Sequence, residues 1–573
     1  MTDLSSVETA APAAPVAAAD VTPAWLEHSI GRLDQRLLSV LLTLGSMLLA
    51  WVFRWTQDDA FISLRYAQQL ADGNGLVYNA GEYVEGYSNF IWTVLMAVPI
   101  RLGWDPVEFG HVVGVLCLGA TVLLTLRVAR AALGSQLLAN AAVVALMATV
   151  TFIAYGTGGL ETSLQTAMVM AVVVLLLPTW TSGELPTAAR AVGVSLLCAA
   201  ALMTRMDSAV VLLVPVGVVA LRTLRRRAAD GGVPRSLGVL AALVLPALVV
   251  LGSWTLWRHS VYGQWLPNTA TAKRSDPLSL VRGVLYFAMF GLLTGTAAFV
   301  PILCTAGRSL ARVRPFGVLL ATIGVWSLYV LAVGADFMEF RFMVVVLPLV
   351  AVVEVALLLR IRSTRWQLAV VAALACSIPL HTMVFRGAAN VDSVGLLHET
   401  VGPGDESWRT LGRLLGEQLG SNPGSNDVVI GVTPAGAIPF ESHLTTIDML
   451  GLTDPWTARH GVELPYEVLP KAGHEHLATI AHLRDRDVSL LIGHPRFAAP
   501  AEPGEVYGAG AVDALFLHEA PDPEHIPDDA SMVEVPVDDE RVLMVLYLEP
   551  DDDVERLLAE GTWREVELDM DQP

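Results

Sequence analysis

Two adjacent carboxylates, Asp58 and Asp59, stand where the first long apolar stretch of the sequence ends. Crowding of two carboxylates raises the pKa of at least one of them, and such a group can act as a general base. Oxygen ligands also suit Mg²⁺, Mn²⁺ or Ca²⁺, so Asp58 and Asp59 could instead bind a divalent cation. A structural role is the third alternative, because Asp at a helix start accepts hydrogen bonds from unpaired backbone amides. The residue types alone leave all three open.

A second candidate set lies in the segment EYVEGYSN, residues 82–89, which combines carboxylates, tyrosines, a hydroxyl and an amide. Sugar hydroxyls bind to groups that accept and donate hydrogen bonds, and sugar ring faces pack on aromatic side chains. The same composition is typical of a solvated loop at a membrane surface, where tyrosines are common. The segment therefore predicts either a carbohydrate site or an interfacial loop.

A short helix must connect these two sets of residues. Apolar side chains recur at helical spacing from Ala60 to Leu70, while polar side chains such as Ser63 and Tyr66 face away from that stripe. This pattern predicts an amphipathic helix lying in the membrane interface. Gly73 and Gly75 are expected to end it.

The amino-acid composition indicates that these segments belong to a membrane protein. The chain of 573 residues is 54% hydrophobic and 16% charged, which is too apolar for an ordinary soluble enzyme. Residues 387–573 carry 10 Lys and Arg against 36 Asp and Glu, so this part reads as an acidic soluble domain. All four cysteines fall in apolar runs, which argues against a disulfide framework.

The apolar runs predict about eleven membrane crossings between residues 31 and 386, after a disordered cytoplasmic leader at residues 1–30. The run from Phe90 to Leu102 is short and is expected to be interfacial or re-entrant. With the N-terminus inside, the arginine clusters of the loops all fall on the cytoplasmic side, as the positive-inside rule requires. These clusters give no indication of nucleic-acid binding.

The same orientation places the unusually polar connectors on the outer face, together with the acidic domain. Cations are unexpected there, and a phosphate at headgroup level would explain them. Ion pairs within the protein, such as Arg205 with Asp207 or Arg341 with Asp336, are the alternative. The candidate phosphate-binding residues are Arg205, Arg258, Lys273 and Arg341.

The acidic domain reads as a small α/β unit. The segments 427–432, 487–493 and 541–549 are apolar, rich in β-branched residues and bounded by turn signals. They predict buried strands separated by loops and short helices.

A cytoplasmic N-terminus, a crossing that ends in an Asp pair and polar outer loops together resemble the GT-C class of glycosyltransferases that use polyprenyl-phosphate sugars. Within this class the sequence is similar to the terminal arabinofuranosyltransferase family of actinobacterial cell-wall assembly. The similar strings are DDAFISLRYAQQLADGNGLVYNAGEYVEGYSNFIW, YGTGGLET, YGQWLPNTATAK, GADFMEFRF and GAIPFESHLTTIDMLGLTDP followed by GHE.

The resemblance implies a GT-C-like membrane domain at residues 31–386, with a catalytic outer loop at residues 56–89 and an extracytoplasmic α/β domain at residues 387–573. It implies transfer of a pentose, arabinofuranose, from a polyprenyl-phosphate donor to a cell-envelope glycan outside the plasma membrane, with Asp58 or Asp59 at its centre. Another sugar such as mannose, or a polymer transporter or scaffold, is the alternative. The candidate substrate-binding residues are Arg65, Tyr66, Glu82, Glu85, Tyr87, Asn89, Glu161, Asn268 and Asp336.

Overall fold

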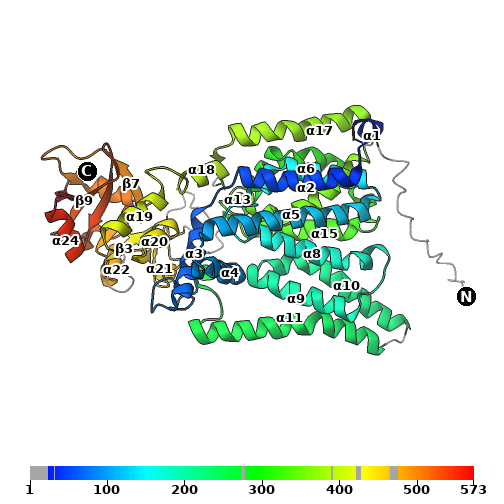
Figure 1. The fold of residues 1–573 in the computed structure, drawn as a ribbon, viewed down its shortest axis with the longest axis horizontal. Coiled ribbons are helices and arrows are strands. Elements are labelled where there is room, and N and C mark those ends of the chain that lie inside the picture. The colour runs from blue at the N-terminus through cyan, green and yellow to red at the C-terminus, as the bar shows by residue number, and fades with distance from the viewer. Residues whose placement is uncertain are drawn as a thin grey trace, which may run out of the picture.

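The computed structural model describes the chain except for residues 1–22, 31–32, 231–232, 273–277, 389–390, 421–427, 465–474 and 573. A bundle of helices forms one part of the molecule, and a smaller α/β part caps one end of it (Figure 1). The helices of the first part are α1 (Ala24–Ile30), α2 (Gln35–Val52), α3 (Asp58–Asp72), α4 (Phe90–Arg101), α5 (Pro106–Leu133), α6 (Gln136–Ala148), α7 (Val150–Ala154), α8 (Thr162–Thr181), α9 (Ala188–Thr204), α10 (Ser208–Asp230), α11 (Val233–Tyr262), α12 (Asn268–Ala272), α13 (Ser279–Leu293), α14 (Val300–Ala311), α15 (Phe316–Ala332), α16 (Leu347–Leu358) and α17 (Thr364–Pro379).

Among the described residues, six helical segments are long and apolar enough to cross a membrane. They are Gln35–Val52, Pro106–Leu133, Thr162–Thr181, Ser208–Arg225, Ser236–Tyr262 and Thr364–Val384. Five shorter apolar helices, α4, α6, α9, α15 and α16, pack with them. The predicted architecture of a helical membrane protein with a C-terminal α/β domain is confirmed, whereas the count of eleven crossings stays a prediction.

The apolar pattern of the sequence predicts crossings near residues 282–306 and 136–154, and both are broken helices. The run near 282–306 divides into α13 and a second helical stretch, Thr296–Ala311, which are bent by 91°. The bend lies at Gly295, whose φ of +73° suits glycine far better than other residues. The run near 136–154 divides into α6 and the five-residue α7.

The C-terminal part is built on a six-stranded mixed sheet. Its order is β11-β9-β10-β7-β3-β4, in which β3 pairs parallel with β4 and β7 while β10, β9 and β11 add antiparallel. Its strands are β3 (Val429–Val432), β4 (Thr445–Asp448), β7 (Leu490–Ala498), β9 (Ser531–Pro536), β10 (Val542–Tyr547) and β11 (Arg564–Val566). The short strands are β1 (Gly387–Ala388), β2 (Val391–Asp392), β5 (Val462–Glu463), β6 (His476–Leu477), β8 (Tyr507–Gly508) and β12 (Leu568–Asp569).

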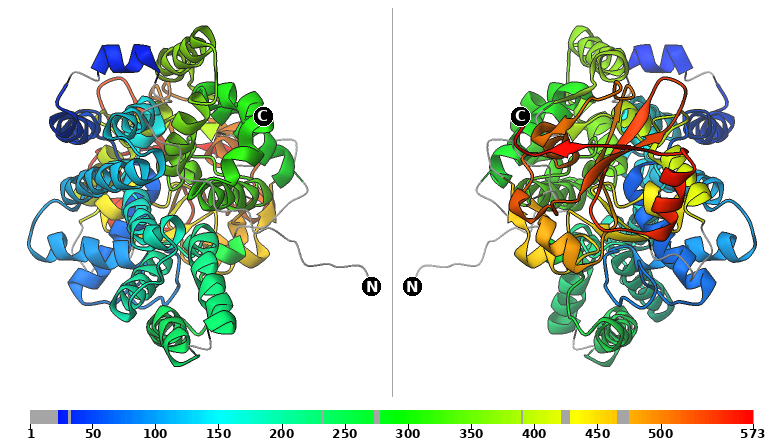
Figure 2. Two further views of the ribbon diagram at one scale, coloured as in Figure 1. Left: turned by 90° about the vertical axis from the view of Figure 1, so that its right-hand side faces the viewer. Right: turned by 90° about the vertical axis from the view of Figure 1, so that its left-hand side faces the viewer.

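Helices cover both faces of this sheet, as its continuous apolar strands require. Leu411 and Leu415 pack on one face together with Val554, and Leu483 and Val512 belong to the cluster on the other face. The helices of this part are α18 (Val394–Glu399), α19 (Trp408–Gln418), α20 (Ala437–Ser442), α21 (Thr457–His460), α22 (Ile480–Asp485), α23 (Ala509–Leu515) and α24 (Asp552–Ala559). The end-on views of Figure 2 show the sheet and its helices lying across the end of the bundle.

Helix α3 lies between the bundle and the C-terminal part (Figure 1). Phe61 contacts Phe440 with ring centroids 5.6 Å apart, and Arg65 donates a hydrogen bond of 3.0 Å to the carbonyl of Leu444. The prediction of a helix that ends at Gly73 is therefore confirmed, and its placement in the membrane interface stays a prediction. Its polar residues are buried, because residues 84–89 bond to Ser63 and Tyr66 while the C-terminal part bonds to Asp58 and Arg65.

The chain start differs from the predicted leader. Residues 1–22 lie outside the described residues, but Ala24–Ile30 forms a helix, in which Leu26 is buried and the Trp25 Nε1 donates to Gln367 of α17 at 3.0 Å. Packing of Trp25 and Leu26 explains the order in this segment. Helix α1 lies at the end of the bundle opposite the C-terminal part (Figure 1).

Candidate active site

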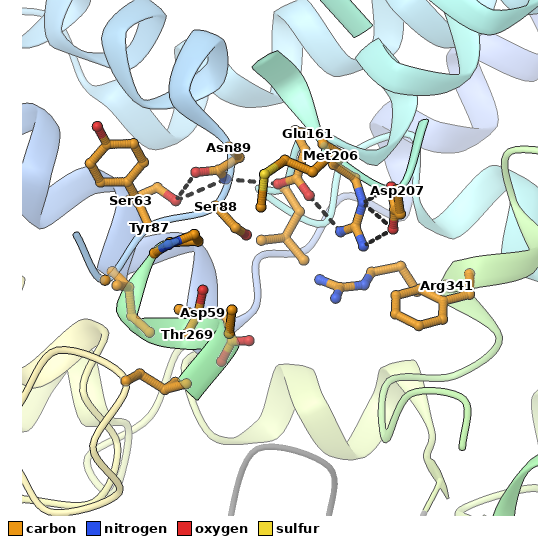
Figure 3. A pocket seen from close by; sticks show the side chains of 18 of the residues that line it. Asp59, Ser63, Tyr87, Ser88, Asn89, Glu161, Met206, Asp207, Thr269 and Arg341 are labelled. Carbon is orange, nitrogen blue, oxygen red and sulfur yellow. Dashed lines mark hydrogen bonds and ion pairs between the residues drawn. The ribbon is translucent and has the colours of Figure 1, made fainter. Parts of the chain in front are cut away.

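A cavity of about 310 Å³ opens where α3, the bundle and the C-terminal part meet. Figure 3 shows carboxylate, guanidinium and hydroxyl groups directed into it. The lining residues are Asp59, Ile62, Ser63, Gly86, Tyr87, Ser88, Asn89, Leu160, Glu161, Arg205, Met206, Asp207, Pro267, Thr269, Ala270, Tyr329, Arg341, Phe342 and Leu452. The outer connectors predicted from orientation therefore converge on one space.

Asp58 and Asp59 face different surroundings although they are neighbours on the first turn of α3. Asp59 lines the cavity (Figure 3). Asp58 is buried, and its Oδ1 accepts a hydrogen bond of 2.7 Å from the backbone N–H of Ala437 in the C-terminal part. Burial raises the pKa of Asp58 to about 7, against the opposing effect of the Ala437 amide. The structure thus distinguishes the two carboxylates: Asp59 is the one that lines the cavity, and Asp58 joins α3 to the C-terminal part.

Arg205 is held at the cavity wall by two carboxylates. Its Nη1 lies 2.7 Å from Glu161 Oε1, and its Nη2 lies 2.6 Å from Asp207 Oδ2. Burial works against the charge of Arg205, but Asp207 and Glu161 outweigh it and raise the guanidinium pKa well above its usual range. Burial likewise opposes ionisation of Glu161, yet Arg205 and Arg341 hold its pKa below the ordinary value. Arg205 and Glu161 are therefore both charged at neutral pH.

Arg341 reaches the same cavity from the connector between α15 and α16. Its Nε lies 2.8 Å from Asp336 Oδ2, while the end of the guanidinium points into the cavity (Figure 3). The preceding residue, Phe340, has a φ of +46°, a conformation that is strained for a bulky residue. Phe340 is fully buried against Tyr286, at a centroid distance of 5.3 Å. We infer that this packing holds the turn that aims Arg341.

The aromatic ring of Phe342 lies beside both cations. The Cζ atom of Arg205 is 5.3 Å from the ring centroid, and that of Arg341 is 5.7 Å away. Cation–π contacts of this kind favour an arginine over a lysine. The two guanidinium groups are thus gathered at one wall of the cavity.

The segment 86–89 supplies the opposite wall. Asn89 donates 2.7 Å to Glu161 Oε2 and shares hydrogen bonds with Ser63, which connects α3 to the arginine cluster (Figure 3). The Tyr66 hydroxyl accepts from the N–H of Gly86 at 2.8 Å and donates to the carbonyl of Val84 at 2.8 Å. Tyr66 thus holds the loop at residues 84–86 without lining the cavity, whereas Tyr87 lines the cavity.

Several predicted residues lie away from the cavity and bind the connectors to each other. Arg258 forms a buried bidentate pair with Glu85, with its Nε 2.7 Å from Oε1. Arg486 of the C-terminal part pairs with Glu82. Lys273 lies outside the residues that the structure describes.

The remaining predicted residues, Arg65 and Asn268, bond to carbonyl groups of the C-terminal part. Arg65 Nη2 donates to Leu444 O, and Asn268 Nδ2 donates 2.8 Å to Gly451 O. Both side chains are buried. Arg65 and Asn268 do not line the cavity, and their hydrogen bonds instead attach the membrane part to loops of the C-terminal part.

Sequence reasoning did not select some of the lining residues. The sequence indicates Asp207 only as a partner of Arg205, and Ser63 only as part of the polar face of a helix. Thr269 and Leu452 had no signal of their own, because neither a lone threonine nor a leucine indicates a site. Thr269 lies next to the selected Asn268, so a search of the flanking residues would have found it.

A metal ion held by both Asp58 and Asp59 would need the two carboxylates to face the same point. In the structure Asp58 accepts a hydrogen bond from Ala437, whereas Asp59 lines the cavity. In the described part of the chain there is no group of three or more His, Cys, Asp or Glu residues arranged to hold a metal ion.

The fold is similar to that of ArnT from Cupriavidus metallidurans, in a crystal structure with bound undecaprenyl phosphate. The match has a TM-score of 0.53 at 16% sequence identity and covers 89% of this chain and 97% of that chain. The GT-C-like fold class predicted from the sequence is confirmed.

Two curated relatives are both named terminal beta-(1->2)-arabinofuranosyltransferase. The protein of Mycobacterium tuberculosis is 28% identical over 293 residues, which cover 48% of this chain and 42% of the relative. The protein of Corynebacterium glutamicum is 28% identical over 347 residues, which cover 53% of this chain and 47% of the relative. A family model described as a domain of unknown function, DUF8728, matches residues 391–534. The resemblance to glycosyltransferases that the motifs indicated is confirmed, over stretches that span less than half of each curated relative.

Proposed function

We propose that the protein is an integral membrane glycosyltransferase that moves arabinofuranose from a polyprenyl-phosphate donor to a cell-envelope glycan. The observation that carries the proposal is the cavity in which one carboxylate, Asp59, shares a space with two guanidinium groups, Arg205 and Arg341. A volume of about 310 Å³ lies at the lower end of the range of small-molecule sites, roughly 300–1,000 Å³. The names of the curated relatives support the choice of sugar.

In this mechanism Asp59 accepts the proton of the attacking acceptor hydroxyl. The new glycosidic bond forms at the anomeric carbon while the bond from that carbon to the phosphate oxygen breaks, and the polyprenyl phosphate leaves with the electron pair. Arg205 and Arg341 stabilise the charge that grows on the phosphate. Because a phosphate is a good leaving group, the step needs no second proton donor.

The remaining polar lining would bind the sugar. Ser63, Asn89 and Thr269 offer hydrogen bonds to sugar hydroxyls, and Tyr87 offers an aromatic surface. The pairs Arg258–Glu85 and Arg486–Glu82 would act indirectly, by holding the connectors around the cavity. Asp336 would keep Arg341 charged and oriented.

We place the N-terminus in the cytoplasm and residues 387–573 outside the plasma membrane. The orientation is supported by Arg130, which lies at the last turn of α5, just before α6. Asn140 of α6 donates 2.9 Å to the carbonyl of Gln35, so this basic connector lies at the same end as the start of α2. The acidic C-terminal part caps the other end of the bundle (Figure 1), and its Leu452 lines the cavity.

The proposal is tested with purified protein in liposomes, supplied with radiolabelled polyprenyl-phosphate arabinofuranose and a short arabinan acceptor. We expect labelled, elongated acceptor from this donor and none from polyprenyl-phosphate mannose. Product from mannose alone would overturn the choice of sugar. Absence of product from both donors would overturn the assignment as a transferase.

A further inference from the structure

The start of α3 is held by the C-terminal part and has no cap of its own. The N-cap residue, Gln57, makes no side-chain hydrogen bond to the helix. Instead Asp58, on the first turn, accepts the hydrogen bond from the N–H of Ala437. The Tyr78 hydroxyl also donates 2.7 Å to the carbonyl of Ala435. Residues 435–437 are thus bonded both to the first turn of α3, which carries Asp59, and to the connector that follows α3.

The contact is close enough to require glycine at position 436. A Cβ atom at Gly436 would overlap the backbone oxygen of Asp58 and lie 2.7 Å from its carboxylate carbon. Gly86 makes a matching approach on the cavity side, where a Cβ would lie 2.6 Å from Thr453 Cγ2 and 2.9 Å from the Leu452 carbonyl oxygen. The two surfaces therefore fit at the backbone level.

The loop on the far side of the cavity rests on the same part of the C-terminal chain. Asn268 Nδ2 donates to the carbonyls of Gly451 at 2.8 Å and Leu452 at 3.1 Å. Its neighbours Pro267 and Thr269 line the cavity, as does Leu452 itself. Residues 433–436 and 449–454 follow β3 and β4, whose carboxyl ends meet at one edge of the sheet because the two strands are parallel.

We propose that residues 435–452 of the C-terminal part position the reactive groups of the membrane part, with Gly436 and Ala437 aiming Asp59 through Asp58. This inference rests on the proposed transferase function. Gly436 and Ala437 are positioning residues, since neither lines the cavity. The cavity of the membrane part is complete only when the C-terminal part is seated on it.

The test compares the full-length variant Gly436→Ala with wild type and with Gly395→Ala. The control glycine lies in α18, where a Cβ would make only ordinary contacts of 3.7 Å with Arg386 and Ser393. We expect kcat of Gly436→Ala to fall about 100-fold, because displacement of a reacting group by about 1 Å has an effect of this size. The KM for the donor and the activity of Gly395→Ala should stay near wild type.

A double-mutant cycle separates positioning from general damage. If Gly436 acts through Asp59, then Gly436→Ala lowers kcat in the wild-type background but not in an Asp59→Asn background. Equal losses in both backgrounds would overturn the proposal. An inactive wild-type protein would instead count against the transferase function.

Tyr78→Phe keeps the test usable if Gly436→Ala does not fold. It removes only the hydroxyl that bonds to Ala435 and should lower kcat several-fold, with the same dependence on Asp59. The proposal would be contradicted if Tyr78→Phe keeps the wild-type kcat and Gly436→Ala is either unfolded or fully active.

Discussion

Asp58 and Asp59 are adjacent in sequence but lie in different surroundings, since Asp59 lines the cavity and Asp58 bonds to Ala437. The sequence predicted that one of them is a base but could not say which. The difference arises from Ala437, which is 379 residues away from Asp58. Local residue types carry no information about a partner at that distance, so only the folded chain separates the two carboxylates.

The raised pKa of Asp58 predicts a pH-dependent stability. Burial raises this pKa from 3.8 to about 7, so the folded protein holds the proton more tightly than the unfolded chain does. Between about pH 4 and pH 7 the unfolded chain loses the proton first, and the protein loses stability as the pH rises. Above about pH 7 the loss is complete, at no more than about 4 kcal/mol.

Asp58→Asn removes this titration and keeps an oxygen for the Ala437 amide. The melting temperature of the variant minus that of wild type should therefore increase from pH 4 to pH 7 and then level off. A difference that stays constant over this range, measured in detergent, would show that Asp58 has an ordinary pKa.

Arg341 predicts a specific effect on donor binding. Arg341→Gln removes the hydrogen bonds that the charged guanidinium would make to the donor phosphate, each of which is worth about 1.5–3 kcal/mol. The KM for the sugar donor should therefore rise roughly tenfold to a hundredfold. The change also leaves Asp336 buried without its cation, which lowers stability. The double variant Asp336→Asn/Arg341→Gln should regain stability but not donor affinity. Recovery of both would argue that Arg341 only supports the fold.

At the scale of elements, the sequence predicted well those features that depend on local pattern. The α3 helix and its stop at Gly73 were predicted, as were most apolar helices and the central strands β3, β7 and β10. The burial of α3 was not, because its polar face is typical of a helix exposed to water. Residues 84–89 bond to Ser63 and Tyr66 on that face, and residues 437–444 bond to Asp58 and Arg65 beside it. No periodicity reveals contacts of this kind.

The turn before α8 predicts a sensitive glycine. Gly159 has a φ of +75°, and a Cβ there would lie 2.7 Å from both Ala60 Cβ and Thr56 Cγ2 at the start of α3. Gly159→Ala should therefore lower stability by about 1–3 kcal/mol and also reduce transfer. Gly193→Ala in α9, where a Cβ meets no atom within 4 Å, should leave the melting temperature unchanged or slightly raised. Equal melting temperatures for the two variants would contradict this account of the turn.

At the scale of the whole molecule, the membrane part and the C-terminal part share one buried polar interface. The sequence predicted both parts and placed the acidic domain on the same side of the membrane as the polar connectors of the membrane part. It could not predict that the second part lines the cavity of the first, because the residues that meet are separated by as many as 404 residues. Arg65 illustrates this, since its guanidinium bonds to the carbonyls of Tyr78 and Leu444.

Loss of Arg65 should loosen this interface. Arg65→Ala leaves two buried carbonyls without their donor, at a cost of about 1–3 kcal/mol for each group. We expect a lower melting temperature and faster limited proteolysis between residues 387 and 435. Arg54→Ala is the matched control, because the contacts of Arg54 lie at the exposed surface, where it pairs with Glu108 at 3.7 Å and contacts the neighbouring Trp51. Identical proteolysis of the two variants would contradict the assigned role of Arg65.

The central claim is that Asp59 is the base for sugar transfer, and the kcat of Asp59→Asn tests it most directly. Asp72→Asn, at the exposed last residue of the same helix, serves as the control. With labelled polyprenyl-phosphate arabinofuranose, we predict that kcat of Asp59→Asn falls by a factor on the order of 10²–10⁴. The donor KM and melting temperature should stay near wild type, and Asp72→Asn should be fully active. Wild-type kcat in Asp59→Asn would contradict the account.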